Sequence, residues 1–383
     1  MRVIHLRRTI LPPTETFIYS QLIHLPPEKA VVLTRDVQNL ESFHGLTVSA
    51  FSQESENWHK CWSRFNYRIF RRMTKFERDF YVREILAFKP DLLHVHFAVD
   101  AAYFSNVWRQ VHLPVVVSCY GYDISSFPNR YGGWGGHYLQ KVWRFASLIL
   151  AMSNDMREDL LRLGCPDEKI RVHYHGINLE RFKYVDRGSD VKKVRILFVG
   201  SLTRRKGVED ILRAFAQIAK QRPQTELRFV GSGVIRSNLE QMARSWGLES
   251  RVSFAGFIEH KKLQDELSFA HIFCHPSRTL INGDKEGIPG TIVEAMATGL
   301  PVVTTKHAGI PEMVRDGVDG FVVAEGDVTA ITQALLTLVD RPYLRAQMGR
   351  KAMKQIHELA NVVRRTADLE AIYRDVIALK RVR

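Results

Sequence analysis

Short apolar segments alternate with longer amphipathic segments along the whole chain. Runs rich in β-branched residues predict strands. In the first half these are Arg2–Leu6, Ala30–Arg35, Leu46–Phe51, Leu92–Phe97, Val115–Tyr120, Leu148–Met152 and Ile170–His175. In the second half they are Arg195–Val199, Glu226–Val230, Val252–Ala255, Ile272–His275, Val302–Thr305 and Phe321–Val323. Alternation of this kind is typical of βαβ units, so we expect mainly parallel sheets that bind ligands beyond the carboxyl ends of their strands.

The helical segments and one polar stretch predict how the chain divides. Predicted helices in the second half are Val208–Gln221, Ser237–Trp246, Lys261–Ala270, Thr291–Thr298 and Val328–Val339. The polar segment Val185–Lys193 predicts a linker, and a chain of 383 residues exceeds one ordinary core. We therefore predict domains at 1–187 and 188–361, and a C-terminal segment at 362–383 whose helix reaches about Leu379.

The segment from Trp58 to Phe80 has the most unusual pattern. Large apolar residues recur every three or four positions and predict one helix: Trp58, Trp62, Phe65, Ile69, Met73, Phe76 and Phe80. A second stripe beside them is cationic: Lys60, Arg64, Arg68, Arg71, Lys75 and Arg78. Two interpretations stay open at this point. The helix either packs its apolar face on the sheet, or it contacts anionic lipid or a lipid-linked acceptor.

The formal net charge of +14 calls for a partner or for a simply solvated basic surface. Nucleic acid is the less favoured partner, because the sequence has no helix-turn-helix, zinc-finger or RNA-binding signature. No apolar run approaches the ~20 residues that span a bilayer. The first residues lack the apolar stretch of a signal peptide, and the four cysteines have no paired spacing. The sequence predicts a cytoplasmic protein.

Candidate chemistry is concentrated between Lys285 and Gly299. Gly287, Pro289 and Gly290 predict a turn that leads into a short buried helix, which Gly299 and the following proline end. The free amides of such a turn suit an anion. Glu294 lies within the helix and needs a hydrogen-bond donor from the protein or from a ligand. Two carboxylates around an anion-binding turn suit a ligand with hydroxyls and phosphates, which is a nucleotide sugar.

A second candidate anion site follows the strand at Arg195–Val199. Gly200 and Ser201 begin a turn that carries three consecutive cations, and Gly207 opens the next helix. Arg205 and Lys206 could neutralise a departing diphosphate there, whereas a solvent-exposed basic turn remains the alternative. The sequence has no Asp-X-Asp and no metal-ligand spacing, so we expect no metal and no cofactor.

Several motifs resemble those of one enzyme family. "KEGIPGTIVEAMATGLPVVTT", "VGSLTRRKGVEDILRAF" and "HGINLERF" are similar to signatures of the retaining glycosyltransferases of family 4. "LLHVHFA" and "CYGYDIS" resemble exopolysaccharide enzymes of the colanic-acid type. The resemblance implies an α/β chain with the GT-B fold. That fold has two Rossmann-like parallel-sheet domains facing across a cleft, and the C-terminal helix returns to the N-terminal, acceptor-binding domain.

The resemblance also assigns roles to residues. Glu294 would bind the ribose hydroxyls of the donor, and Glu286 would contact the donor sugar. Arg205 and Lys206 would hold the diphosphate, so the expected catalytic residues are Arg205, Lys206 and Glu286. The expected donor-binding residues are Gly200, Ser201, Gly207, Ile288, Pro289, Gly290, Thr291 and Glu294.

On the acceptor or sugar side, the candidates are Glu15, His96, Tyr120 and Asp123. For His96 and Asp123, a structural role and substrate contact are equally open. Tyr120 stands where most relatives have His, and a phenol cannot carry a proton near neutral pH as an imidazole does. Ser201 stands where many relatives have an Arg, which Arg205 could replace.

The expected reaction is transfer of a hexose from a nucleoside diphosphate sugar, with retention, to a glycan acceptor. The basic aromatic segment 58–80 favours a polyprenyl-diphosphate-linked acceptor and peripheral contact with the inner face of the membrane. The expected role is exopolysaccharide biosynthesis. A nucleotide-sugar epimerase of the same fold would use the same donor site without an acceptor. A basic nucleic-acid-binding protein would explain the charge but leaves the Glu286–Glu294 pair unexplained.

Overall fold

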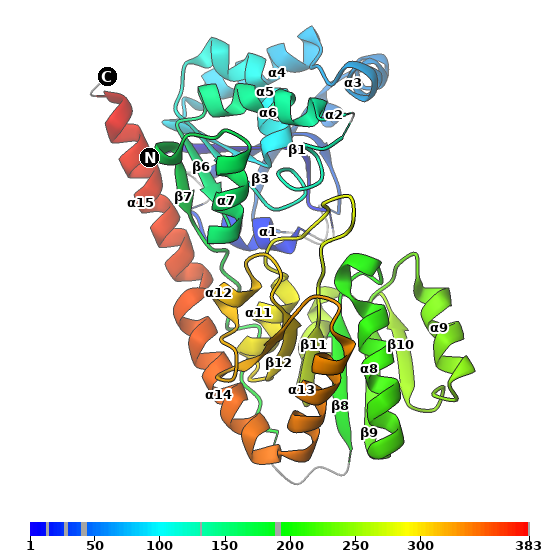
Figure 1. Ribbon diagram of the computed structural model, residues 1–383. Helices are drawn as coiled ribbons and strands as arrows, with labels where there is room; N and C mark the ends of the chain where they lie inside the picture. The colour runs from blue at the N-terminus through cyan, green and yellow to red at the C-terminus, as the bar shows by residue number, and fades with distance from the viewer. Residues whose placement is uncertain (13–14, 27–29, 40–43, 131, 188–192, 382–383) are drawn as a thin grey trace. The chain divides into compact units, whose positions relative to one another are not determined.

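A computed structural model describes residues 1–12, 15–26, 30–39, 44–130, 132–187 and 193–381 (Figure 1). Contacts divide the chain into unit 1, which is Met1–Gly176 with Val362–Arg383, and unit 2, which is Ile177–Asn361. The predicted boundary lies later, after residue 187. Residues 177–187 group with unit 2, where Arg187 donates hydrogen bonds to the carbonyls of Ala270 (2.6 Å) and Thr298 (2.7 Å). Within the predicted linker, positions 188–192 lie outside the described residues.

Unit 1 is built on a parallel sheet of seven strands in the order β3-β2-β1-β4-β5-β6-β7. The strands are β1 (Val3–Ile10), β2 (Ala30–Val37), β3 (Thr47–Ala50), β4 (Leu92–His96), β5 (Val115–Ser118), β6 (Leu148–Ala151) and β7 (Ile170–Val172). Each overlaps a predicted strand, although β1 and β2 continue beyond their predicted ends at Leu6 and Arg35, and β7 ends before its predicted end at His175. The expected parallel α/β architecture is confirmed for this part of the chain.

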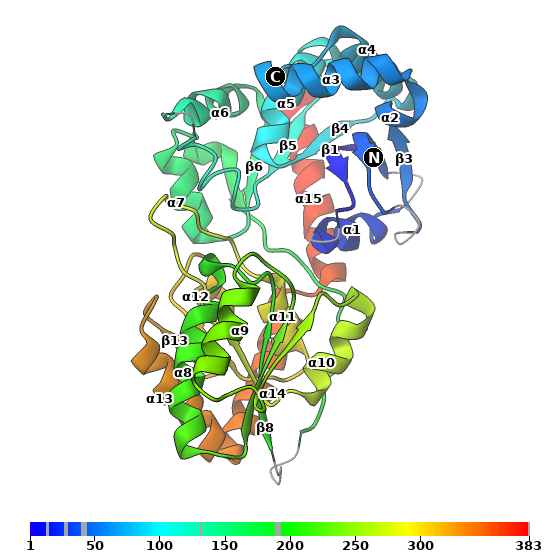
Figure 2. The same ribbon diagram turned by 90° about the vertical axis from the view of Figure 1, so that its right-hand side faces the viewer.

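Helices cover both faces of the unit 1 sheet. One face packs against α4 (Lys75–Phe88), α5 (Ala98–Val111), α6 (Trp134–Phe145) and α7 (Asn154–Arg162). The other face packs against α1 (Thr16–Ile23) and α15 (Val362–Arg381), which lie beside each other in Figure 2. Leu369 and Tyr373 of α15 bury their side chains against strands β1, β4, β5 and β6. The C-terminal helix thus completes the core of unit 1.

The single helix predicted over 58–80 is wrong, because the chain forms two helices there. Helix α2 is only Phe51–Glu54, α3 spans Asn57–Phe70, and α4 begins at Lys75. Arg71 ends α3 in the left-handed conformation at φ 53°. Thr74 then starts α4, since its hydroxyl accepts a hydrogen bond from the amide of Glu77 at 3.3 Å. A continuous apolar stripe therefore crosses a helix break that the spacing alone does not reveal.

Unit 2 holds a parallel sheet of six strands in the order β10-β9-β8-β11-β12-β13. They are β8 (Val194–Val199), β9 (Thr225–Val230), β10 (Val252–Gly256), β11 (Ile272–His275), β12 (Val302–Thr305) and β13 (Gly320–Val323). The helices are α8 (Val208–Gln221), α9 (Arg236–Ser245), α10 (Leu263–Phe269), α11 (Gly290–Ala297), α12 (Ile310–Met313), α13 (Val328–Asp340) and α14 (Pro342–Leu359). Helices α8, α9 and α13 share one core with the sheet, and α11 packs on β11, β12 and α14. The six predicted strands are all present.

Candidate functional site

The glycine-rich turn leads directly into the short helix α11. Pro289 is its N-cap, and Gly299 follows its C-cap with φ 81°. The hydroxyl of Thr291 donates to the carbonyl of Val199, at the end of β8, at 3.1 Å. The amide of Ile288 has no acceptor among the described residues. The first turn of α11 is thus fixed beside the end of β8, and an amide remains available there for an anion.

Glu294, on the buried face of α11, has a protein partner. Its side chain is 9% exposed, and its Oε1 lies 2.9 Å from Nε2 of His260. Burial lowers the pKa of the neighbouring Arg181, and the charge of Glu294 raises it. A carboxylate this deeply buried needs a hydrogen-bond donor. His260 supplies one and leaves the second carboxylate oxygen for other contacts.

Glu286 and Lys206 form an ion pair at the carboxyl ends of β8 and β11. Both side chains are largely buried, and Ser277 donates from its hydroxyl to Oε1 of Glu286 at 2.5 Å. Burial alone would raise the pKa of Glu286, but the charge of Lys206 and the hydrogen bonds it receives lower this pKa to about 2. Glu286 is therefore a carboxylate at any physiological pH.

Arg205 lies on the same turn and points to another carboxylate. Its Nη1 lies 3.1 Å from Oδ1 of Asp284, and its carbonyl accepts from the amide of Arg278 at 2.8 Å. Both predicted diphosphate-binding cations thus have carboxylate partners within unit 2. Gly207 closes the turn with φ 66°, and a Cβ there would lie 1.9 Å from the carbonyl oxygen of Pro276. Only glycine permits this close approach.

Four residues near Glu286 escaped the sequence analysis: His275, Ser277, His307 and Glu325. The amide of Glu286 donates to Nε2 of His307 at 3.3 Å, and Nδ1 of His307 lies 2.6 Å from Glu325. The proton of His307 must therefore lie on Nδ1. Burial and the charge of Lys206 lower the pKa of His275 to about 3. From the sequence, two of these residues could have been selected only by their place in the chain, because His275 ends the predicted strand β11 and Ser277 follows it.

The acceptor-side candidates in unit 1 are mostly held by protein contacts. Glu15 receives two hydrogen bonds from Arg7, at 2.7 and 3.2 Å. Asp123 accepts from the amides of Ala98, Tyr120 and Gly121, at 2.8 to 3.1 Å. These contacts fix the loop that follows β5. Asp123 thus holds this loop, and its contact with a substrate stays a prediction.

His96 and Tyr120 belong to a buried network of aromatic side chains. The Tyr120 hydroxyl lies 2.5 Å from Nδ1 of His96, and Nε2 of His96 lies 3.1 Å from His5. His94 stacks on His96 with ring centroids 4.4 Å apart, and it is hydrogen-bonded to Tyr373 (2.5 Å) and Ser118 (2.8 Å). Burial lowers the pKa of all three histidines, so they are neutral at physiological pH.

The three histidines His5, His94 and His96 are also the candidate metal ligands among the described residues. Their nitrogens lie within 4.8 Å of one another and are fully buried. However, among the ring nitrogens of these three described histidines, Nε2 of His5 is the only one without a hydrogen-bond partner. The arrangement fits a neutral hydrogen-bonded network, because a metal would have to replace bonds that already exist.

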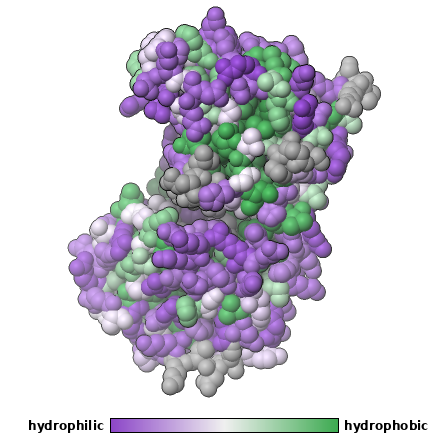
Figure 3. Space-filling view, turned by 180° about the vertical axis from the view of Figure 1, so that it is seen from behind, coloured by the Kyte–Doolittle hydropathy of each residue, from purple (hydrophilic) through white to green (hydrophobic). Residues whose placement is uncertain are grey.

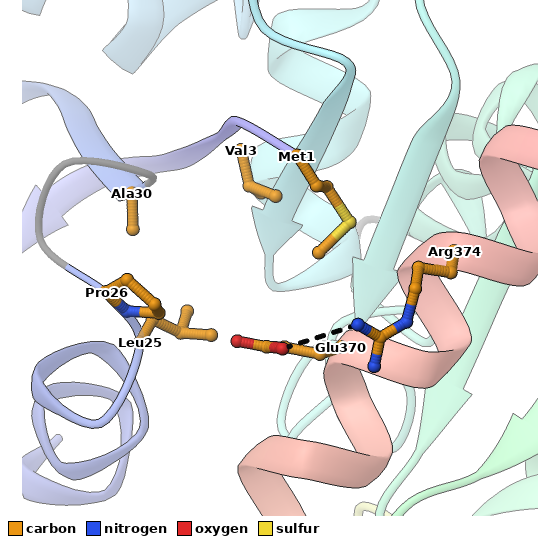
Figure 4. A pocket seen from close by; sticks show the side chains of 7 residues that line it. All are labelled: Met1, Val3, Leu25, Pro26, Ala30, Glu370 and Arg374. Carbon is orange, nitrogen blue, oxygen red and sulfur yellow. Dashed lines mark ion pairs between the residues drawn. The ribbon is translucent and has the colours of Figure 1, made fainter.

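A small pocket in unit 1 is not part of the candidate site. Two of its lining residues form an ion pair, in which Oε2 of Glu370 lies 3.8 Å from Nη1 of Arg374. Figure 4 shows these two side chains lying toward each other. The lining residues are Met1, Val3, Leu25, Pro26, Ala30, Glu370 and Arg374. The pocket lies where β1 and β2 begin, whereas parallel sheets bind ligands beyond the strands' carboxyl ends.

The chain belongs to the family 4 glycosyltransferases. Residues 181–355 match the family model of the glycosyl transferases group 1, and residues 31–181 match that of glycosyltransferase family 4. The family assignment made from the motifs is thereby confirmed.

Among the helices of the described residues, none has the length and the apolar character that a membrane span requires.

Two curated relatives are named for polysaccharide synthesis. The amylovoran biosynthesis glycosyltransferase AmsK of Erwinia amylovora is 37% identical over 261 residues, which cover 66% of this chain and 62% of AmsK. The putative colanic acid biosynthesis glycosyltransferase WcaL of Escherichia coli K12 is 32% identical over 254 residues, covering 65% and 61%. The chain thus spans less than two thirds of the length of either relative.

Solved structures agree on the fold. HepE of Anabaena in complex with UDP superposes with a TM-score of 0.81 at 20% identity, over 98% of this chain and all of that one. Its complex with UDP-glucose gives a TM-score of 0.78. The lipopolysaccharide outer core galactosyltransferase WaaB gives 0.71 at 16% identity, over 98% and 100%. The two-sheet GT-B fold expected from the motifs is confirmed.

Proposed function

We propose that this chain transfers a hexose from a nucleoside diphosphate sugar to a glycan acceptor, with retention of anomeric configuration. The main support is the Lys206–Glu286 pair, which lies beside the glycine turns that precede α8 and α11. A carboxylate, a cation and free amides at one end of a parallel sheet suit sugar hydroxyls and phosphates together. Glu294 would accept from the ribose hydroxyls, and Glu286 from the sugar.

In the proposed reaction, bond breaking places new negative charge on the leaving diphosphate. Lys206 and Arg205 would leave their carboxylates and pair with this charge, which develops most fully in the transition state. Glu286, freed from Lys206, would then accept hydrogen bonds from the sugar. A front-face displacement, in which the leaving phosphate takes the proton of the acceptor hydroxyl, gives retention without a protein nucleophile.

The comparisons favour particular substrates. HepE is solved with UDP and with UDP-glucose, which favours a UDP-sugar donor for this chain. AmsK and WcaL are named for amylovoran and colanic acid biosynthesis, which favours a growing exopolysaccharide as acceptor. Such an acceptor is expected to be linked to a lipid diphosphate at the inner face of the membrane, where the chain would act as a peripheral cytoplasmic enzyme.

The proposal is tested by thermal unfolding in a panel of UDP-, GDP- and ADP-sugars. A donor at 100 times its Kd stabilises the native state by about 2.7 kcal/mol, so the matching donor will raise the Tm by several degrees. Glu294→Ala removes an acceptor for charged hydrogen bonds, each worth roughly 1.5–3 kcal/mol, and will weaken binding about 10- to 100-fold.

Glu249→Ala is the matched control, because Glu249 is an exposed carboxylate in the loop after α9. It will bind the donor as the wild type does. A wild-type Tm that no nucleotide sugar raises would contradict the donor site. Donor turnover that needs no glycan acceptor would contradict the proposal that the chain is a glycosyltransferase acting on a glycan.

A further inference from the structure

Helix α3 turns its apolar stripe away from the protein. Trp58, Trp62, Phe65 and Ile69 lie four, three and four positions apart, on one side of the helix. Their side chains are 50–56% exposed, and Phe70 and Phe76 nearby are 58% and 45% exposed. The face of the molecule shown in Figure 3 carries many hydrophilic residues, and hydrophobic residues also gather in the upper part of the view. A row of large apolar side chains on one exposed helix marks an interaction surface.

The opposite side of α3 is held to the rest of unit 1 by a hydrogen bond and by the packing of two aromatic rings. Ser63, the one buried residue of α3, donates to the buried carboxylate of Glu77. Tyr67 packs edge-on against Tyr103, with ring centroids 5.1 Å apart, and the Tyr103 hydroxyl donates to Glu77 at 2.6 Å. These contacts fix the rotation of the helix about its axis. The apolar stripe is therefore held outward by the fold.

Unpaired cations accompany the stripe. The segment Glu56–Phe76 holds six Lys or Arg residues and one acidic residue. Within the part of the chain that the structure describes, Arg68, Arg72 and Lys75 are exposed and have no carboxylate partner. Arg64 pairs with Asp36 at 2.7 Å. The exposed apolar stripe is thus bordered by net positive charge.

We propose that α3 and the turn to α4, residues 56–76, bind the surface of an anionic bilayer. Helices that lie in a membrane interface combine Trp, Phe and aliphatic residues on one face with Lys and Arg beside it. Each cation near an anionic surface strengthens binding roughly fivefold. The surface belongs to unit 1 alone, so the inference goes beyond the proposed transfer reaction and does not depend on it.

Charge argues against a second copy of the chain as the occupant. An isologous dimer through this surface would bring two sets of like charges together, which is unfavourable.

The aromatic faces that a single-stranded nucleic acid would need are partly occupied. Trp62 stacks on Phe65 with centroids 5.7 Å apart, and Trp58 contacts His59 at 3.8 Å. Single-stranded nucleic acid needs free ring faces for stacking, so it is less favoured.

The test is flotation of the full chain with vesicles of phosphatidylcholine alone or mixed with phosphatidylglycerol. We expect binding to the mixed vesicles at low salt, weaker binding at high salt, and a blue shift of tryptophan fluorescence. Arg68→Ser/Arg72→Ser/Lys75→Ser will lower the partition constant on the order of 100-fold, since each cation contributes roughly fivefold. Trp62→Ser/Phe65→Ser will reduce the blue shift, since Trp58 remains on the stripe, and will lower partition at least about tenfold.

Matched controls lie in unit 2. Trp246 and Phe269 are 43% and 66% exposed, so Trp246→Ser/Phe269→Ser removes comparable apolar surface. Arg350→Ser/Lys351→Ser/Lys354→Ser removes three exposed cations from α14. Both controls will bind mixed vesicles as the wild type does, and equal Tm values will show that every variant folds.

Three results would overturn the proposal. One is a wild-type protein that does not bind the mixed vesicles. Another is equal loss of binding in the stripe variants and their controls. A third is a surface that forms dimers or binds single-stranded RNA in preference to vesicles. Donor-induced Tm shifts are measured separately, so failure of the membrane surface and failure of the donor site give different results.

Discussion

Both sheets place a bonded pair of polar side chains at the carboxyl ends of their strands, but the His96–Tyr120 pair of unit 1 and the Lys206–Glu286 pair of unit 2 differ in charge. In unit 1, His96 and Tyr120 are neutral and hydrogen-bonded to each other at 2.5 Å. Burial lowers the pKa of His96 and raises that of Tyr120 well away from physiological pH. In unit 2, Lys206 and Glu286 carry opposite charges and pair with each other.

This difference separates a structural network from a site that can exchange partners. Neutral groups that already bond to one another have little to gain from a ligand. A charged pair can separate when a ligand brings both an anion and hydroxyl groups, because each member then finds a new partner. Polar residues at strand ends therefore indicate a ligand site more strongly when they are charged.

The largest expected effect is that of Lys206→Ala on turnover. Removing a group that stabilises charge in a transition state lowers turnover about 100- to 1000-fold. Release of nucleoside diphosphate in the presence of a glycan acceptor measures this loss. Lys220→Ala, at the exposed end of α8, is the matched control and will keep full activity. If Lys206→Ala turns over at the wild-type rate, Lys206 does not stabilise the leaving diphosphate.

Glu286→Gln tests the charge of the same pair through stability. The pKa of Glu286 is about 2 in the folded state, against an ordinary value of 4.5. A lowered pKa gives stability that is fully present above the unfolded pKa and is lost as pH falls through the folded pKa. The difference in free energy of unfolding between wild type and Glu286→Gln, a few kcal/mol at about pH 7, will therefore shrink below about pH 4.5.

Urea unfolding from neutral to acid pH measures this difference. Glu249→Gln, which changes an exposed carboxylate, will show almost none at any pH. A difference that is constant down to about pH 2 would mean that Glu286 is not held ionised by Lys206.

The smallest expected effect is that of Tyr120→Phe, which keeps the ring and removes the bond to His96. One neutral hydrogen bond contributes about 1 kcal/mol, so stability will fall by that amount while turnover stays within about twofold. Tyr343→Phe, whose parent side chain is 73% exposed, is the control for both measurements. A fall in turnover of tenfold or more would instead place the Tyr120 hydroxyl on the substrate.

Much of the fold followed from the sequence, because parallel strands and their crossover helices have strong local patterns. β11 and β12 begin and end where predicted, and α8 spans its predicted Val208–Gln221. The partners of the candidate site residues could not be predicted in this way. His307 and Glu325 lie far along the chain from Lys206, and only the packing of the strand ends brings such residues together.

Two helices of equal length show what the sequence determined and what the tertiary structure decided. Helices α3 and α8 each have 14 residues and a clear apolar stripe, and both were predicted as helical. α8 buries Ile211, Phe215 and Ile218, as such a stripe normally does. α3 buries only Ser63, because the contacts of Ser63 and Tyr67 with the core hold its other face inward. Periodicity fixes which residues share a helix face. Which face turns to solvent depends on long-range contacts that the local pattern does not contain.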